Sequence, residues 1–291
     1  MDILSLNVFN HKLFDMRVFF VFIILAGAFQ QISAQSVKFL SYNIRLDIAS
    51  DGENSWPNRK DFLVAQLKFY GPDIIGTQEA LPGQVAYIDE QLTDYHYVGV
   101  GREGTAGEHT VIFYRKDRFK LLEENTFWLS ETPGEVSMGW DAAYLRVCTY
   151  ARFQDKKTKK RFWIFNTHLD NSGLQARMEG VKLIVRKMDE IGVSSEPVVL
   201  MGDFNALPES EVIGFANQYF TSAEELSVVP PFGPHGTFNG FNFGKPIANK
   251  IDYVFVKRPV RCAVLKYAVL TDSDDWKYPS DHFPVFAEIK F

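Results

Sequence analysis

The sequence predicts an α/β fold, on the basis of three observations. Short, β-rich apolar runs alternate with amphipathic stretches along the chain. Several of these runs end in a carboxylate, an amide or an imidazole, and open α/β sheets carry their sites at such strand ends. Hydrophobic residues make up 46% of the 291 residues and aromatic residues 15%, which is enough for a sizeable core. Since no repeat or linker follows residue 35, we expect residues 35–291 to form one domain.

Residues 1–34 are expected to be a secretory signal rather than part of the fold. Arg17 precedes an apolar run over residues 18–28, and Ile32-Ser33-Ala34 offers a cleavage site. The run is too short to span a bilayer comfortably, so an uncleaved anchor is the less favoured alternative. Met16 stands directly before Arg17, so residues 1–15 can also be read as an over-long start. We therefore expect a periplasmic or secreted protein with no stable membrane span after cleavage.

Charge and cysteine content narrow the class of protein further. The net charge is -5 and the isoelectric point about 5.7, which argues against a dedicated duplex-DNA binder because such proteins need a basic footprint. Cys148 and Cys262 both lie in apolar, strand-like runs. They do not resemble a disulfide framework, and we interpret them as small buried core residues.

The first half of the chain alternates predicted strands and helices. The run Val37–Arg45 alternates in polarity and is the first strand. After a polar loop, apolar residues at helical spacing predict a helix that ends at Gly71-Pro72. A buried strand over 73–79, a short helix after Pro82 and strands over 97–100, 109–115 and 120–128 follow. Between the first two of these strands, the glycine-rich stretch 101–108 lacks a phosphate-loop lysine and is expected to be a flexible rim.

The second half continues in the same way. Strands over 144–154 and 161–169 are predicted to form a hairpin around a basic, solvated turn. An amphipathic helix is predicted over 174–191. The remaining predicted elements are a buried strand ending at 202–205, a long aromatic loop over 230–244, and strands over 251–256, 261–270 and 283–289.

Gly202-Asp203-Phe204-Asn205 closes the most strongly apolar of these strands. Residues two apart on a strand point the same way, so Asp203 and Asn205 are expected to project together from its tip. Taken alone, the motif is more often a strand-ending Asx turn. Similar polar strand ends elsewhere in the chain reverse that preference.

Eight polar residues at or near strand ends form a candidate site. Each has an ordinary structural interpretation when taken singly, such as a loop cap for an asparagine or a solvated surface position for a glutamate. As a set they supply hard oxygen ligands and imidazoles, which suit Mg²⁺ or Mn²⁺ with a phosphate better than zinc. The eight are Asn43, Glu79, His168, Asp203, Asn205, Asp252, Asp281 and His282.

In this order the motifs resemble those of the endonuclease/exonuclease/phosphatase family of metal-dependent phosphoesterases. The resemblance implies a DNase I-like fold: two packed mixed β-sheets flanked by helices in a four-layer α/β/β/α sandwich. The chain is most similar to an exported bacterial branch related to deadenylases and nocturnin. It lacks the Trp-Cys-Asp-Arg block of inositol polyphosphate 5-phosphatases and the paired cysteines of DNase I. The matching blocks are Ser-Tyr-Asn43, Thr-Gln-Glu79, Asn-Thr-His168-Leu, Gly-Asp203-Phe-Asn205, Ile-Asp252-Tyr and Ser-Asp281-His282.

The resemblance implies that Glu79 is the main ligand of Mg²⁺ or Mn²⁺, helped by Asn43 and Asp281. Such a cation polarises a phosphoryl oxygen and stabilises the leaving oxygen. Sites with one cation and with two both remain open.

The resemblance also implies catalytic roles for the other five residues. Asp203 would orient and deprotonate the attacking water. Asn205 and His168 would hold the non-bridging oxygens of the phosphate. Asp252 would hold the ring of His282, which contacts the phosphate as an imidazolium. Either Asp203 or His282 can be the base at this stage.

The expected activity is hydrolysis of phosphoester bonds, by a phosphodiesterase or nuclease or by a phosphatase. The expected substrate is a phosphorylated small molecule or a single-stranded nucleic acid, bound by a monomer. We expect Glu108 and His109 to face the site and His109 to contact substrate, although a histidine at a strand start is more often structural. Phe241 of the aromatic loop is also expected to contact substrate, although core filling is the default for aromatic residues. The alternative is a non-catalytic or lipid- or sugar-phosphate-binding protein on the same scaffold, which the full set of eight residues disfavours.

Overall fold

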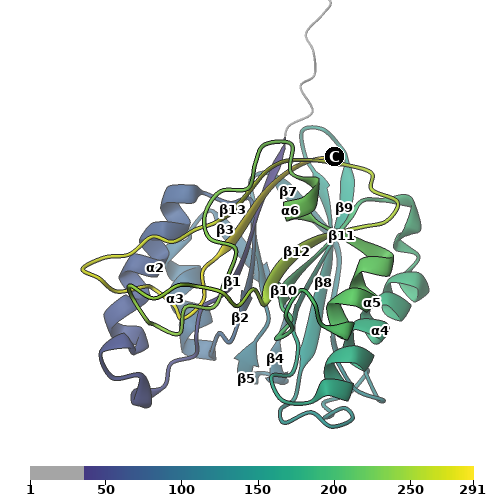
Figure 1. The fold of residues 1–291 in the computed structure, drawn as a ribbon. Coiled ribbons are helices and arrows are strands. Elements are labelled where there is room, and N and C mark those ends of the chain that lie inside the picture. Colours follow the sequence, from purple (N-terminus) through teal and green to yellow (C-terminus); the bar gives the residue numbers. More distant parts are fainter. Residues whose placement is uncertain (1–35) are drawn as a thin grey trace, which may run out of the picture. The chain divides into compact units, whose positions relative to one another are not determined.

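The structure, a computed structural model, describes residues 36–291, and the predicted signal segment lies outside them. Two six-stranded mixed sheets pack face to face, with helices on their outer faces (Figure 1). This arrangement confirms the four-layer α/β/β/α sandwich. Within residues 36–291, no helix is both long and apolar enough to cross a bilayer.

The first sheet has the strand order β13-β14-β1-β2-β6-β3. Its central strands β1 and β2 are parallel to each other, and every other pair of adjacent strands in this sheet is antiparallel. The short helix η1 (Ala49–Asn54) follows β1, and helices α2 (Trp56–Tyr70) and α3 (Pro82–Gln91) belong to the same half of the chain. The strands are β1 (Val37–Asn43), β2 (Ile74–Gln78), β3 (Tyr95–Val98), β6 (Ile112–Arg115), β13 (Ala263–Val269) and β14 (Val285–Lys290).

The second sheet has the order β11-β12-β10-β9-β8-β7, with β9 and β10 parallel. Helix α4 (Leu174–Ile191) has the predicted bounds and ends at Gly192, which adopts a left-handed conformation. The segment after β10 carries α5 (Glu211–Tyr219), β11 and α6 (Ala223–Leu226), none of which we predicted; the side chain of Ser210 caps α5. The strands are β7 (Phe119–Trp128), β8 (Val147–Asp155), β9 (Arg161–His168), β10 (Val198–Asp203), β11 (Phe220–Ser222) and β12 (Asp252–Lys257), and the short helix η2 (Val193–Ser195) precedes β10.

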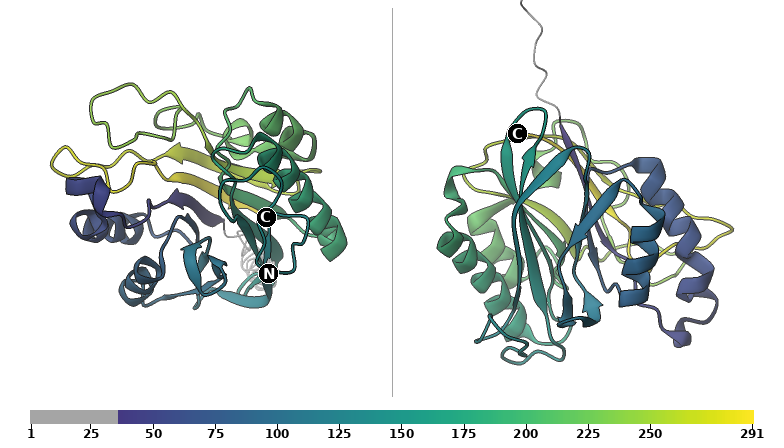
Figure 2. Two further views of the ribbon diagram at one scale, coloured as in Figure 1. Left: turned by 90° about the horizontal axis from the view of Figure 1, so that it is seen from below. Right: turned by 180° about the vertical axis from the view of Figure 1, so that it is seen from behind.

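Three apolar layers hold the sandwich together. They lie between the sheets and helices that Figure 2 shows from two further sides. One lies between the two sheets, where Phe39, Phe153 and Phe162 are buried. Another lies between the first sheet and helices α2 and α3, and the third lies between the second sheet and helices α4 and α5. Strand β10 is buried on both faces, which explains its unbroken apolar sequence.

Two local predictions need correction. The glycine-rich stretch 101–108 is not a flexible rim but a two-stranded hairpin, β4 (Gly101–Glu103) and β5 (Ala106–His109). Of the two cysteines, Cys148 is buried in the core, whereas Cys262 is only half-buried.

Candidate active site

The site lies at one end of the interface between the two sheets, and strand alternation puts it there. Val199 and Met201 of β10 face the other sheet, so Asp203, two residues further, faces the same way. By the same alternation, His168 lies on the face of β9 that carries Ile164, and Asp252 lies on the face of β12 that carries Val254. Polar strand ends from several elements therefore converge on the mouth of the sandwich.

Strand pairing aligns three of these residues in one row. His168 is the partner of Asp203 across the parallel β9–β10 pair, and Asp252 is its partner across the antiparallel β10–β12 pair. Residues directly opposite one another on adjacent strands have neighbouring side chains. The register thus places a carboxylate between an imidazole and a second carboxylate.

Gly202 makes this register possible. Its φ of 147° and the close approach of β9 leave no room for a side chain, because a Cβ atom there would lie 1.9 Å from the carbonyl oxygen of Thr167. The glycine before Asp203 is therefore a requirement of strand packing.

Three residues at the strand ends adopt left-handed backbone conformations that are uncommon for non-glycine residues. They are Arg45 with φ 56°, Glu79 with φ 62° and Asn205 with φ 46°. Such conformations collect at functional sites, where the surroundings hold them in place. All three residues line one pocket.

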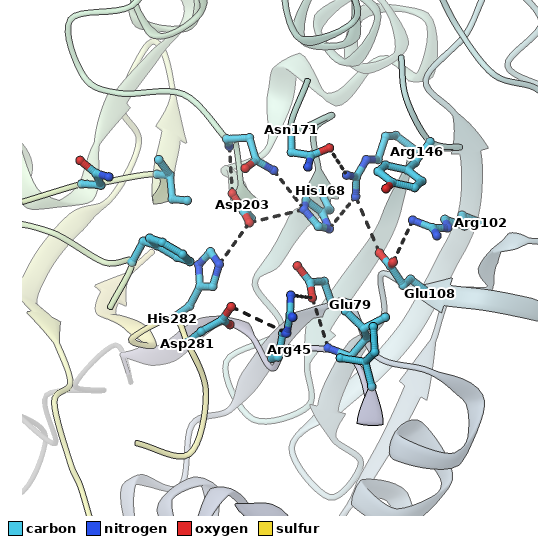
Figure 3. A pocket seen from close by; sticks show the side chains of 17 residues that line it. Arg45, Glu79, Arg102, Glu108, Arg146, His168, Asn171, Asp203, Asp281 and His282 are labelled. Carbon is cyan, nitrogen blue, oxygen red and sulfur yellow. Dashed lines mark hydrogen bonds and ion pairs between the residues drawn. The ribbon is translucent and has the colours of Figure 1, made fainter. Parts of the chain in front are cut away.

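This pocket has a volume of about 600 Å³ and opens at the end of the sandwich (Figure 3). Six of the eight predicted site residues line it: Glu79, His168, Asp203, Asn205, Asp281 and His282. The other two, Asn43 and Asp252, are buried and contact the lining residues from behind.

Asn43 joins two of the carboxylates. Its Nδ2 donates to Oε1 of Glu79 at 2.9 Å and to Oδ2 of Asp203 at 3.0 Å. Its Oδ1 accepts from the backbone N–H of Arg45 at 3.0 Å. The amide therefore fixes the orientation of both carboxylates.

Asp203 lies between two imidazoles. Its Oδ2 is 3.4 Å from Nε2 of His168 and 3.8 Å from Nε2 of His282. Burial and the charge of Asp252 raise the pKa of Asp203 to about 7, although His282 acts in the opposite direction. A carboxylate with a pKa near neutrality is suited to accept a proton.

His282 is held by a buried carboxylate on its other side. Its Nδ1 lies 2.9 Å from Oδ2 of Asp252, which also accepts a hydrogen bond from Oγ1 of Thr237 at 2.6 Å. Burial disfavours the imidazolium, but the charges of Asp252, Asp203 and Asp281 outweigh it and raise the pKa of His282 well above its usual value. The ring is therefore charged, with Nε2 turned toward Asp203.

His168 has the opposite electrostatic environment. Burial, the guanidinium of Arg146 and the charge of His282 hold its pKa well below the usual value. Arg146 lies 3.0 Å from Nδ1, and because a guanidinium only donates, the ring proton is on Nε2. The Nδ2 of Asn205, 3.1 Å from this Nε2, donates instead to the carbonyl of Leu169 at 3.0 Å.

The carboxylates can hold a divalent cation. Carboxylate oxygens of Glu79 and Asp203 lie within 4.8 Å of each other, whereas His168 has no free ring nitrogen, because Nδ1 faces Arg146 and Nε2 carries the proton. Asp281, the third predicted ligand, faces Glu79 across the guanidinium of Arg45, whose nitrogens are 4.0 Å from Glu79 and 3.9 Å from Asp281. Both separations exceed hydrogen-bond length, because the Arg45 guanidinium is hydrogen-bonded to Asp51 instead. The space between Glu79 and Asp281 therefore already holds one positive group. This donor set fits the hard cation that the sequence predicts.

Two residues predicted to contact substrate lie outside the lining of this pocket. His109 is buried in the β4–β5 hairpin, where its Nδ1 contacts the carbonyl of Gly107 at 3.0 Å. The ring of Phe241 lies 5.8 Å from the guanidinium of Arg59. Neither residue is among those that line the pocket.

Sequence reasoning also missed part of the pocket. Arg102, Arg146 and Asn171 line the wall beside Glu108, the one residue of this group that we expected there. Arg146 directly precedes β8, and a lone charged residue entering an apolar run is a signal that could have identified it. Thr237, which supports Asp252, had no such signal because it lies in a long loop.

Comparisons with known proteins agree with this geometry. The model of the Endonuclease/Exonuclease/phosphatase family matches residues 40–282. A solved mannosyl-6-phosphatase of Bacteroides thetaiotaomicron is 36% identical, with a TM-score of 0.83 over 88% of this chain and 100% of that one. An endonuclease/exonuclease/phosphatase from Bacteroides vulgatus is also 36% identical, with a TM-score of 0.82 over 88% and 99% of the two chains.

Other curated relatives match this chain over only part of their own lengths. An uncharacterized mimivirus protein is 30% identical over 52% of this chain and 59% of its own length. Mouse nocturnin is 20% identical over 89% of this chain and 66% of its own length. The chain thus spans less than two thirds of either of these curated relatives.

Proposed function

The chain belongs to the endonuclease/exonuclease/phosphatase family, and we propose that it is a divalent-cation-dependent phosphomonoesterase that acts on a sugar phosphate. Family membership makes it a phosphoesterase. The choice of a monoester, of the sugar and of Mg²⁺ or Mn²⁺ is our proposal.

One observation carries it: the buried carboxylate of Asp203 and the charged ring of His282 meet at a pocket of about 600 Å³. Pockets of this size bind small molecules. The 36% identity to a mannosyl-6-phosphatase across 88% of this chain supports the same substrate class.

We assign the cation to the carboxylates of Glu79 and Asp281, with Asn43 orienting Glu79 from behind. When bound, a divalent cation supplies Lewis-acid polarisation of the phosphoryl group and stabilises negative charge.

The remaining groups handle protons and the phosphate oxygens. Asp203 Oδ2 accepts a proton from the attacking water, because its pKa near 7 balances ionisation against basicity. The Nε2–H of His282, charged through Asp252, donates to a phosphoryl oxygen. The Nε2–H of His168, whose proton position Arg146 fixes, donates as well, so both rings act as preorganised donors.

We further propose that the protein is exported to the periplasm or medium, on the basis of the apolar run over residues 18–28. The mature protein should then begin near Gln35. N-terminal sequencing of the native protein tests this, and a cytoplasmic protein that retains Met1 would contradict it.

A comparison of two chromogenic substrates tests the activity. We expect p-nitrophenyl phosphate to be hydrolysed faster than bis-p-nitrophenyl phosphate in Mg²⁺ or Mn²⁺, and both rates to be abolished by EDTA. His282→Ala should remove the activity, whereas His235→Ala, at a side chain that is 66% exposed, should not. Preferential hydrolysis of the diester and of single-stranded RNA would favour a nuclease instead. Inactivity toward every phosphoester would favour a binding protein.

A further inference from the structure

One wall of the pocket carries charged and polar residues that have no role in the proposed reaction. Arg102, Glu108 and Asn171 lie on the far side of His168 from Asp203 and His282 (Figure 3). The β4–β5 hairpin supplies Arg102 and Glu108, and Asn171 follows β9. These residues need an explanation, because charged side chains on a partly buried wall are costly to retain.

The charges on this wall compensate one another. Glu108 Oε1 pairs with Arg102 at 2.9 Å, and Oε2 lies 3.7 Å from Arg146. The side chain of Glu108 is 13% exposed and that of Arg102 is 16% exposed, so both keep atoms open to the pocket. Both guanidiniums lie over the ring of Tyr144, at 5.0 and 5.5 Å, which holds them in place.

This composition selects a particular ligand chemistry. An anionic group would meet the carboxylate of Glu108, and an apolar group would displace water from these charged atoms without replacing its hydrogen bonds. A hydroxyl group both donates and accepts, so it can bond a carboxylate and a guanidinium that stand side by side. Two neighbouring hydroxyl groups on a sugar ring can therefore bind the Glu108 carboxylate, which accepts, and the Arg102 guanidinium, which donates.

The wall also lies within reach of the reacting phosphate. Nδ1 of His168 is 3.0 Å from Arg146, and Nε2 of the same ring is 3.4 Å from Asp203. A single imidazole therefore separates the two halves of the pocket. A sugar ring whose phosphate lies at Asp203 can contact the wall without leaving the pocket.

We propose that Arg102, Glu108 and Asn171 form a subsite that binds the ring hydroxyls of the substrate sugar; the inference rests on the proposed phosphatase function. Glu108 accepts from one hydroxyl, and Arg102 donates to a neighbouring one. Asn171, an exposed residue whose Oδ1 lies 3.4 Å from Arg146, contributes from the rim. This subsite discriminates sugar phosphates from phosphate esters that lack hydroxyls.

The test compares two monoesters that differ in hydroxyl groups. Values of kcat/KM are measured for D-mannose 6-phosphate and for p-nitrophenyl phosphate with the wild type, Glu108→Gln and Asn171→Ala. The control for the loss of a carboxylate is Glu124→Gln, at an exposed position of β7 outside the pocket lining. Thermal midpoints monitor the fold.

We expect the ratio of the two kcat/KM values, sugar phosphate over p-nitrophenyl phosphate, to fall on the order of 10- to 100-fold in Glu108→Gln, the range for a hydrogen bond to a charged group. Asn171→Ala should lower this ratio less, and Glu124→Gln should leave it at the wild-type value. Because the ratio is taken within one protein, partial unfolding does not change it.

Two other results would overturn the inference. If the wild type hydrolyses p-nitrophenyl phosphate but Glu108→Gln and Asn171→Ala keep the wild-type ratio, the subsite is wrong and the phosphatase function stands. If the wild type hydrolyses neither monoester, the proposed function is wrong, and the proposed subsite, which depends on it, is wrong as well.

Discussion

Oδ2 of Asp252 lies 2.9 Å from Nδ1 of His282, and Asp252 is also the cross-strand partner of Asp203. One buried carboxylate therefore acts on both groups that handle protons. Its charge raises the pKa of His282, and it also raises the pKa of Asp203. The pH dependence of the reaction follows from this arrangement.

The wild-type enzyme should show a bell-shaped dependence of kcat/KM on pH. Asp203 must be ionised to accept a proton, so activity should rise as pH increases through the Asp203 pKa, about 7 without a cation and lower when a cation is bound nearby. His282 must be protonated, so activity should fall at alkaline pH, above its raised pKa. A pH–rate profile with p-nitrophenyl phosphate measures both limbs, and a profile without an acidic limb would contradict the role of Asp203.

Asp252→Asn should move both limbs of that profile to lower pH. Removing the charge lowers the pKa of Asp203 and that of His282 together, because Asp252 raises both. We also expect kcat to fall on the order of 10²- to 10³-fold, the scale of one acid–base or electrostatic contact. The control is Asp189→Asn, at a side chain that is 68% exposed.

A double-variant cycle tests whether Asp252 and His282 act as a unit. The losses of Asp252→Asn and His282→Ala should be far from additive, since the second change removes the group that the first one orients. Additive losses, or pH limbs that do not move in Asp252→Asn, would mean that the 2.9 Å contact has no catalytic role.

Local pattern in the sequence predicted the strands that carry the candidate site and the polar residues at their ends, six of which line the pocket. Two patterns can be recognised from the sequence alone: the apolar run before Asp203, and the alternation of residues along β1, β9 and β12. Similarity of the ordered motifs to a known family then supplied the packing of two sheets. Pattern alone could not show that β9 and β12 both border β10, which is what aligns His168 and Asp252 with Asp203.

The expectations that the pocket lining does not match concern residues whose position depends on tertiary contacts. We expected both Glu108 and His109 to face the site, but the β4–β5 hairpin buries His109 and only Glu108 lines the pocket. Nothing in the local sequence distinguishes two such neighbours, because one residue of register exchanges their faces. Phe241 lies outside the pocket lining for a similar reason, since loop conformation and not composition decides where its ring packs.

Glu79→Gln should weaken cation binding. The change removes one charge from the carboxylates that border the proposed site, while the amide can still accept from Nδ2 of Asn43. We expect the Kd for Mn²⁺ to rise at least about 10-fold. Calorimetric titration without substrate measures it, with the exposed Glu124→Gln on β7 as a control for net charge. An unchanged Kd would remove Glu79 from the ligand set.

Gly202→Ala should destabilise the fold and the site together. The new Cβ would meet the Thr167 carbonyl at 1.9 Å, so β9 and β10 would have to separate beside His168 and Asp203. We expect the free energy of unfolding to fall by roughly 2–4 kcal/mol in urea denaturation. Gly214→Ala is the matched control, because no atom lies within 4 Å of its Cβ on α5, and it should be neutral or slightly stabilising. Equal stabilities of the two variants would refute this account of Gly202.

Arg59 of α2 should prove as important to the site as its ligands, although it does not line the pocket. This buried guanidinium donates to the carbonyls of Ile44 at 2.5 Å, of Arg45 at 2.6 Å and of Pro279 at 3.0 Å. These bonds tie the backbone after Asn43 to the backbone before Asp281.

Arg59→Met keeps the apolar stem but removes the Arg59 hydrogen bonds to the carbonyls of Ile44 and Pro279, whereas the Arg45 carbonyl still accepts from Nε2 of Gln84 at 2.9 Å. Each carbonyl that is left without a donor and that water does not reach costs about 1–3 kcal/mol. We therefore expect a lower urea midpoint, and also weaker Mn²⁺ binding, because Asp281 is no longer held against Glu79. Arg59→Lys should recover only part of either loss, since an ammonium cannot reproduce the planar fork. The exposed Arg186→Met on α4 controls for the loss of charge. If Arg59→Met were destabilised but bound Mn²⁺ with wild-type affinity, Arg59 would support the fold without positioning the site.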